Sequence, residues 1–227
     1  MTYDLYIGDR MFSSWSLRGW LMFSRFGILC RTHMVGLYSG TMAEDLAHIA
    51  PARLVPAIRT PDGTVVGESL AMAETLADAH PDAGLWPSQS GLRATARWLS
   101  AEMVAGFSNL RADCPMQLAR CYMGFQPSGA VLADLNRIET LWSHARSVSG
   151  VEKGWLFGDY CLADVFYTPV AARIIGYGLP VSDAARAYAL ALLAVPEVQS
   201  WRREALEVTY TPEPYALDLP STAWPAA

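Results

Sequence analysis

The sequence predicts two domains, an α/β unit followed by an all-helical unit, and three observations lead to this. Strand-like alternation and helical periodicity both occur over roughly the first 80 residues. Pro and Gly then gather in a short stretch, after which only helical spacing remains. We therefore expect an α/β domain at 1–80, a linker at 81–91, and an all-helical domain with a C-terminal tail at 92–227.

The elements expected in the first domain follow a mixed order. Tyr3, Leu5 and Ile7 alternate with polar or small residues as in a first strand, and Leu17, Trp20 and Leu21 fall on one face of a helix. The expected elements are strands at 3–7, 30–37, 57–60 and 65–66 and helices from about 17 to 27, at 42–49 and at 68–79, with a turn at 61–63. This βαβ–ββα order is the thioredoxin-like arrangement.

Only helical spacing is visible in the second domain. The expected helices cover 92–110, 135–145, 163–176, 183–194 and 197–206, and the first of them carries Met103, Phe107 and Arg111 at four-residue intervals. Such stripes are more often core than binding site. The last 18 residues form a Pro-rich tail with Tyr210, Tyr215 and Trp224, which either wraps the surface or is partly disordered.

Composition excludes several classes of protein. A net charge of -5 without a dense Lys/Arg cluster argues against a nucleic-acid surface. The longest apolar stretch, 189–195, is too short to cross a membrane, and the N-terminus lacks a secretion signal, so we expect a cytoplasmic location. The four cysteines show no metal-ligand spacing and are interpreted as buried reduced thiols, so we expect no metal.

A run of hydroxyl residues lies where the first strand meets the first helix, in Ser13-Ser14-Trp15-Ser16-Leu17-Arg18. The N-terminus of a helix favours anions, and a Ser hydroxyl there can donate a hydrogen bond to a bound thiolate. Ser13 and Ser16 occupy the place of a C-x-x-C pair, so this chain forms no disulfide there. The alternative is that one serine only caps the helix.

Two further motifs in the first domain suit an extended peptide. Val55-Pro56 precedes the third strand, where a cis peptide would leave backbone groups free to pair with a ligand, although an ordinary trans start of the strand is the alternative. Glu68-Ser69 begins a helix that could hold a carboxylate at its N-terminus and an ammonium group at the glutamate, or could simply be a cap. A peptide with a thiol, an ammonium group and carboxylates suits all three motifs, and glutathione is such a molecule.

The order of these three motifs resembles that of glutathione transferases, and the resemblance extends over essentially the whole chain. Leu85-Trp86-Pro87 and the segment 157–164 also look like that family, and the S-S-W-S-L-R motif resembles bacterial members similar to the zeta and theta classes. The resemblance implies that Ser13, or its close competitor Ser14, supports the glutathione thiolate. It also implies that Trp15 belongs to the glutathione site, that Val55 pairs with the cysteinyl unit, that Pro56 is cis, and that Glu68 and Ser69 hold the γ-glutamyl end.

The sequence departs from the family pattern at several positions. Leu54 stands where members often have a cation, and Arg53 is displaced by one residue, which in an extended segment reverses the side chain's direction. Ala50 replaces an asparagine, and Cys161 replaces the Ser/Thr cap that precedes Asp164. We expect Arg18 to form a structural ion pair.

Three functional hypotheses follow. The first is a glutathione transferase whose thiolate attacks a small hydrophobic electrophile, in a cavity walled by residues 12–15 and by Met103, Phe107 and Arg111 if these are not core. The second is a zeta-like cis–trans isomerase of the maleylacetoacetate type, which ranks lower because few cations besides Arg111 are evident. The third is a non-catalytic binding protein of this fold. The resemblance also implies a homodimer.

Overall fold

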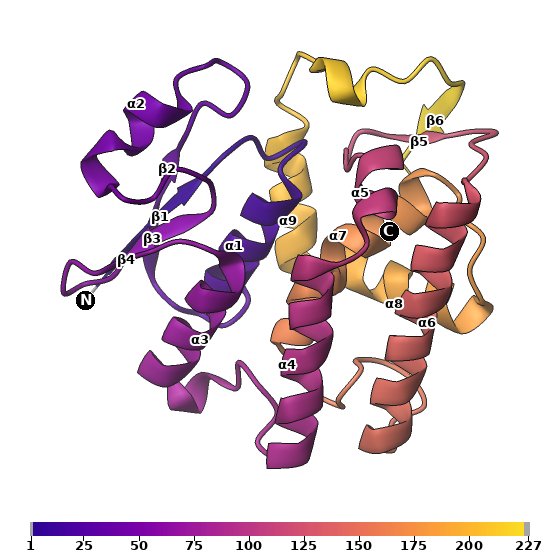
Figure 1. Ribbon diagram of the computed structural model, residues 1–227, viewed down its shortest axis with the longest axis horizontal. Helices are drawn as coiled ribbons and strands as arrows, with labels where there is room; N and C mark the ends of the chain where they lie inside the picture. The colour runs from indigo at the N-terminus through magenta and orange to yellow at the C-terminus, as the bar shows by residue number, and fades with distance from the viewer. Residues whose placement is uncertain (1, 225–227) are drawn as a thin grey trace.

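Two units of secondary structure are evident in the computed structural model, which describes residues 2–224 (Figure 1). The first half contains β1 (Tyr3–Ile7), α1 (Ser14–Ser24), β2 (Cys30–Met34), α2 (Met42–Leu46), β3 (Ala57–Arg59), β4 (Val65–Val66) and α3 (Ser69–Ala79). Short 3₁₀ turns lie at Ala47–Ile49 and Pro81–Ala83. This order confirms the predicted thioredoxin-like unit; the predicted second strand ends three residues earlier, at Met34.

The four strands form one mixed sheet in the order β2-β1-β3-β4, with β1 parallel to β2 and antiparallel to β3. The predicted alternation in β1 is confirmed, because Tyr3, Leu5 and Ile7 join the main core shared with α1 and α3. Tyr6 points the other way, into a small second core under α2.

The second half is helical, with two short strands in addition. It comprises α4 (Ser90–Ala105), α5 (Ser108–Asp113), β5 (Arg120–Tyr122), α6 (Gly129–Ser149), α7 (Leu162–Gly176), α8 (Asp183–Leu193), α9 (Pro196–Ala205), a 3₁₀ turn (Glu213–Tyr215) and β6 (Ser221–Ala223). Helix α7 is buried on all sides at the centre of this half. Asp164 caps it by accepting a 2.9 Å hydrogen bond from the Cys161 amide, so the substituted cap position still takes part in a capping box.

Two predictions for this half are wrong in detail. The long helix predicted at 92–110 is broken, because Gly106 ends α4 and Phe107 adopts a left-handed conformation with φ of 57°. The expectation of helices alone missed the antiparallel pair of β5 and β6. Strand β6 belongs to the predicted tail, which wraps the surface as far as Trp224; residues 225–227 of that tail lie outside the described residues.

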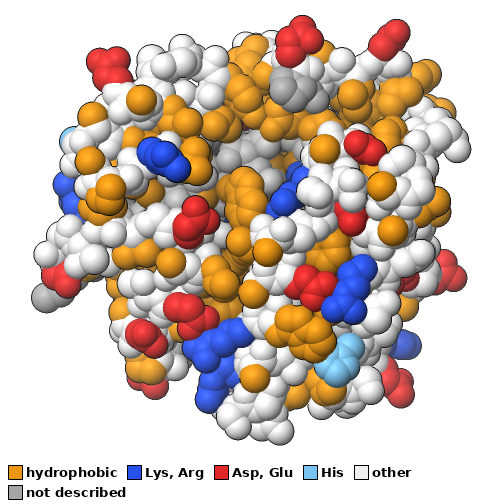
Figure 2. Space-filling view, in the orientation of Figure 1, with side chains coloured by type: hydrophobic (Ala, Val, Ile, Leu, Met, Phe, Trp, Pro, Cys, Tyr) orange, Lys and Arg blue, Asp and Glu red, His pale blue; other side chains and the backbone are white. Residues whose placement is uncertain are grey.

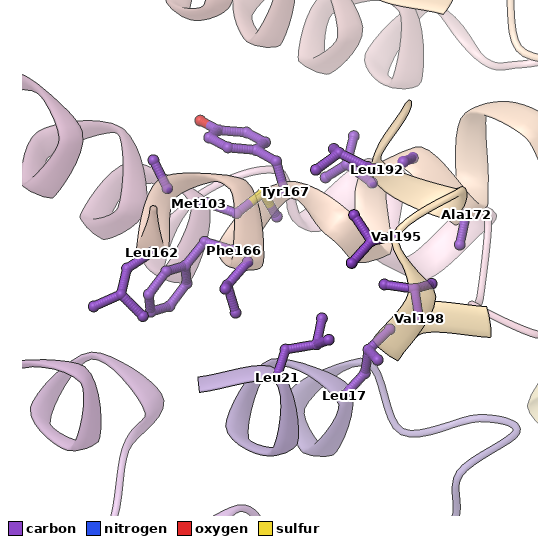
Figure 3. Close-up of a cluster of buried hydrophobic side chains, with 14 of the residues drawn as sticks. Leu17, Leu21, Met103, Leu162, Phe166, Tyr167, Ala172, Leu192, Val195 and Val198 are labelled. Carbon is purple, nitrogen blue, oxygen red and sulfur yellow. The ribbon is translucent and has the colours of Figure 1, made fainter. Parts of the chain in front are cut away.

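One continuous hydrophobic core joins the two halves. Leu17 and Leu21 of α1 face Phe166 of α7 and the start of α9, as Figure 3 shows. The side chains of Leu17, Leu21 and Phe166 are fully buried. Burial of this apolar surface fixes α1 against the helical half. None of the helices formed by residues 2–224 has the length and hydrophobicity needed to cross a membrane.

The opposite side of α1 touches the loop before β3. A side-chain carbon at Gly19 would lie 2.6 Å from Cβ of Pro56, which is closer than atoms can pack. Gly19 therefore permits a close approach between α1 and the Val55–Pro56 peptide, which is cis.

Replacing Gly19 with alanine therefore tests this approach. We expect Gly19→Ala to lower the free energy of unfolding by about 1–3 kcal/mol through overpacking against Pro56, measured by urea denaturation. Gly129→Ala is the matched control, because a side-chain carbon at Gly129 would meet no atom within 4 Å. We expect that change to leave stability unchanged or to raise it by less than about 1 kcal/mol. Equal effects of the two changes would contradict this view of α1.

Candidate functional site

A cavity of about 540 Å³ lies between the loops of the sheet and the helical half. Figure 2 shows this face hollowed, with hydrophobic side chains around the hollow and a Lys/Arg side chain at its edge. The residues predicted from the sequence all line it: Ser13, Ser14, Trp15, Val55, Pro56, Glu68 and Ser69. The other lining residues are Phe12, Leu37, Tyr38, Met42, Leu54, Arg111, Arg173 and Tyr215. The fold thus brings three separate sequence motifs to one cavity.

The two candidate serines differ in their hydrogen bonds. Ser13 is the N-cap of α1: its Oγ accepts a 3.2 Å hydrogen bond from the Ser16 amide and donates one of 2.8 Å to Ser16 Oγ. Ser16 Oγ in turn accepts a 2.9 Å bond from the Gly8 amide. Ser14 Oγ takes part in no hydrogen bond with any residue in 2–224, although Ser14 is only 7% exposed. The Ser14 hydroxyl is therefore the one free to donate into the cavity.

The Val55–Pro56 peptide is cis, which confirms the expectation for Pro56, and the Ala50–Pro51 peptide is cis as well. Val55 lies just before β3, and no turn or loop hydrogen bond within the described chain uses its N–H or C=O. An extended ligand could pair with these backbone groups. Leu54 also lines the cavity, whereas Arg53 is exposed and is not one of the lining residues.

The N-terminus of α3 faces the cavity at Glu68 and Ser69. Glu68 has a φ of 60°, a left-handed value that is strained for a residue with a side chain. The Oγ of Ser69 is buried and finds no hydrogen-bond partner within residues 2–224. A buried hydroxyl without a partner is costly, and the first amides of a helix attract anions. A carboxylate bound here would accept hydrogen bonds from both the Ser69 hydroxyl and the first amides of α3.

A cluster of arginines forms another part of the site. Arg111 of α5 and Arg173 of α7 line the cavity, and Arg18 of α1 lies fully buried beside them. The Arg18 guanidinium stacks 4.5 Å from the Trp15 ring centroid, and that of Arg111 lies 5.7 Å from it. Arg18 donates to the Phe166 carbonyl at 2.9 Å, and none of the ion pairs among residues 2–224 includes Arg18, so the predicted ion pair is wrong.

The buried guanidinium groups lack some of the hydrogen-bond acceptors and negative charges that would offset their burial. Both Nη atoms of Arg18 are buried without a hydrogen-bond partner in the described chain. Burial, then the neighbouring Arg173 and Arg111 charges, hold the Arg18 pKa well below its usual value. Burial also lowers the pKa of Arg173 to about 10, so that group remains charged at neutral pH. The field in this part of the cavity therefore favours an anion.

Sequence reasoning included Arg111 but missed Arg173. Arg173 donates from Nε to the Cys114 carbonyl at 2.8 Å and from Nη1 to the Pro169 carbonyl at 3.1 Å, and these two bonds hold it inside the protein. The available signal was a charged residue near the end of a predominantly apolar helix. Met103 and Phe107, considered for the cavity wall, are core residues.

Residues 12–79 match the family model of the glutathione S-transferase N-terminal domain. A probable maleylacetoacetate isomerase from Caenorhabditis elegans is 36% identical over 114 residues, which are 50% of this chain and 52% of that protein, so the match spans about half of each. A glutathione transferase homologue from Burkholderia, crystallised with bound glutathione, superposes with a TM-score of 0.68 at 23% identity, covering 92% of this chain and 100% of its own. A glutathione transferase from Methylococcus capsulatus superposes with a TM-score of 0.65 at 22% identity, covering 91% and 100%.

The different hydrogen bonding of the two serines predicts different effects on stability. Ser13→Ala removes the cap of α1 and is expected to lower the free energy of unfolding by about 1 kcal/mol. Ser14→Ala removes no internal hydrogen bond and is expected to change it by less than about 0.5 kcal/mol. Urea denaturation of both variants measures this; a larger loss for Ser14→Ala would reverse the assignment.

Proposed function

We propose that this chain, which has a glutathione S-transferase N-terminal domain and the glutathione transferase fold, is an enzyme that binds glutathione in the cavity and activates its thiol. The free hydroxyl of Ser14 at the N-terminus of α1 carries this proposal. Ser14 Oγ would donate a hydrogen bond to the thiolate, and the helix dipole would add a favourable field. Both effects lower the pKa of a bound thiol.

Three parts of the cavity suit the parts of glutathione. The N-terminus of α3 offers Ser69 Oγ and open amides to the γ-glutamyl carboxylate, and the Glu68 carboxylate suits the ammonium group. The N–H and C=O of Val55, which no turn or loop hydrogen bond within residues 2–224 uses, suit the cysteinyl unit. The bound glutathione in the Burkholderia homologue is consistent with this fit. The glutathione sulfur would be the nucleophile, and Ser14 and the helix dipole would stabilise its thiolate form. Trp15 would line the cavity beside the sulfur.

Glutathione binding and thiol activation test this function. We expect the wild-type protein to bind glutathione in calorimetry and to give the ultraviolet absorbance of a thiolate at neutral pH. Ser14→Ala is expected to bind glutathione but to raise the pKa of the bound thiol by about 1 unit or more, which is the scale of one lost hydrogen bond to a charged group. Ser13→Ala is the comparison variant: it removes the cap of α1 but keeps the Ser14 hydroxyl, so it should raise the pKa of the bound thiol less than Ser14→Ala does.

Other results would favour another function. No binding at millimolar glutathione would rule out a glutathione-dependent enzyme and would indicate that this fold serves another function here. Binding without a thiolate signal would favour the non-catalytic binding protein. Loss of the signal in Ser13→Ala alone would transfer the activating role to Ser13.

The arginines favour a second, narrower candidate, the glutathione-dependent cis–trans isomerisation of an unsaturated dicarboxylic acid. Arg111 and Arg173 line the cavity and carry positive charge that no carboxylate among the lining residues except Glu68 could offset. Carboxylates on the second substrate would satisfy these groups. The relative from Caenorhabditis elegans, described as a probable maleylacetoacetate isomerase, agrees with this candidate.

Removing one cavity cation separates the two candidates. We expect Arg111→Gln to lower kcat/KM for isomerisation of a maleyl-type acid about 10- to 100-fold, because a hydrogen bond to a charged group contributes about 1.5–3 kcal/mol. Arg203→Gln, at an exposed arginine of α9, is the control and should have no effect. A wild-type enzyme that turns over neutral electrophiles but no dicarboxylic acid would leave conjugation as the function.

Two implications of the resemblance remain predictions. We propose that the protein is a homodimer, which sedimentation measures, and that it is cytoplasmic. The identity of the second substrate would come from a screen of electrophiles against the glutathione-loaded protein.

A further inference from the structure

The segment after α9 crosses from the helical half to the loop that carries the serines. In Figure 1 this segment, in yellow, runs along the top of the molecule before β6 pairs with β5. Two tyrosines along it, Tyr210 and Tyr215, reach residues of the first half. The segment therefore links two regions far apart in the sequence.

Asp9 shapes the loop that leads into the serines. Asp9 is only 6% exposed. Its Oδ1 accepts hydrogen bonds from the amides of Met11 at 2.8 Å and Phe12 at 3.1 Å. The Asp9 carbonyl accepts a 2.9 Å bond from the Ser13 amide. In this turn the aspartate accepts hydrogen bonds from the amides that follow it in the chain, and these bonds fix the start of α1.

Oδ2, the other oxygen of the same carboxylate, accepts a hydrogen bond from the hydroxyl of Tyr210. Burial, followed by the bond to Asp9, raises the pKa of Tyr210 to about 12, so the phenol keeps its proton and remains a donor at neutral pH. The ring of Tyr210 also lies 6.2 Å from that of Phe12. A donor from the C-terminal segment thus completes the hydrogen bonding of a nearly buried carboxylate.

Tyr215 forms a second link to the same loop. Its hydroxyl donates to the Phe12 carbonyl at 3.3 Å and accepts from the Tyr38 hydroxyl at 2.7 Å, while its ring packs 4.5 Å from that of Phe12. The Tyr122 hydroxyl donates a 3.1 Å hydrogen bond to the Tyr215 carbonyl. Phe12, directly before Ser13, is therefore held by its side chain and by its backbone.

We propose that Tyr210 is a positioning residue that acts through Asp9 to hold the serine loop, and with it the Ser14 hydroxyl, in place for the glutathione sulfur. This inference rests on the proposed function. Tyr210 does not line the cavity, so its effect on a bound thiol passes through the loop alone. The groups proposed to hold the γ-glutamyl end, Glu68 and Ser69, form no hydrogen bond with it.

The variant Tyr210→Phe removes one hydroxyl and keeps the ring beside Phe12. Tyr210 is 51% exposed, so the change leaves the core intact, and thermal unfolding verifies that the variant is folded. We expect the affinity for glutathione to stay within about threefold, while the pKa of the bound thiol rises by about 0.5–1 unit, because activation depends on geometry more steeply than binding does. Amide exchange at Met11 and Phe12, measured by NMR, should become about tenfold faster.

Tyr3→Phe is the matched control, because it removes a phenol that makes a 3.0 Å hydrogen bond to His80, away from the cavity. It should change neither the thiol pKa nor the exchange of the two amides. An unchanged thiol pKa in Tyr210→Phe, with glutathione still bound, would overturn the positioning role alone. A wild-type protein that binds no glutathione would overturn the proposed function together with this role.

Discussion

The burial of α1 between the sheet and the helical half is the packing interaction on which the cavity depends. One side of the helix meets α7 and α9 through Leu17 and Leu21, and Gly19 allows Pro56 to approach the other side. The helix therefore has little freedom to move or rotate. Because its N-terminus carries Ser13 and Ser14, this packing also decides where the hydroxyls and the positive end of the helix dipole point.

The same arrangement creates the charge of the cavity. Arg18 is buried on α1, Arg173 on the central helix α7, and Arg111 joins them from α5. Trp15 lies within cation–π distance of two of these guanidinium groups. Arg18 and Arg173 are buried and form no ion pair within residues 2–224, whereas Arg111 is only partly buried and has Asp134 near it. Buried cations without a carboxylate partner reduce stability, so the presence of Arg18 and Arg173 beside a cavity favours an anionic ligand as their partner. Arg111 and Arg173 line the same cavity as Ser14, so the glutathione site that we propose and a second, anionic substrate would share one positively charged space.

Sequence patterns were sufficient to predict the order of elements in the first half and the motifs that meet at the cavity. Tyr3, Leu5 and Ile7 alternate along the chain and share one face of β1, although the structure buries the other face as well, and Val55-Pro56 and Glu68-Ser69 lie at positions where a strand and a helix begin. The family resemblance added that Pro56 is cis. These features depend on local spacing and on the family motif, which the sequence displays directly.

Other features depend on contacts between distant residues. Which serine is free depends on Ser13 bonding to Ser16, and Arg173 reaches the cavity only because α7 is central and buried on every side. The left-handed conformation of Phe107 divides a helix whose apolar stripe is continuous in the sequence. Strand β6 forms because β5 lies beside it, a pairing across about one hundred residues that no local pattern in the tail reveals.

A crystal structure of the protein with glutathione would show which serine contacts the sulfur, because it places the sulfur relative to both hydroxyls. We expect the sulfur within hydrogen-bonding distance of Ser14 Oγ, with Ser13 still bonded to Ser16 and the γ-glutamyl carboxylate at Ser69. A sulfur bonded to Ser13, or glutathione bound away from the N-terminus of α1, would show that Ser14 is not the activating residue.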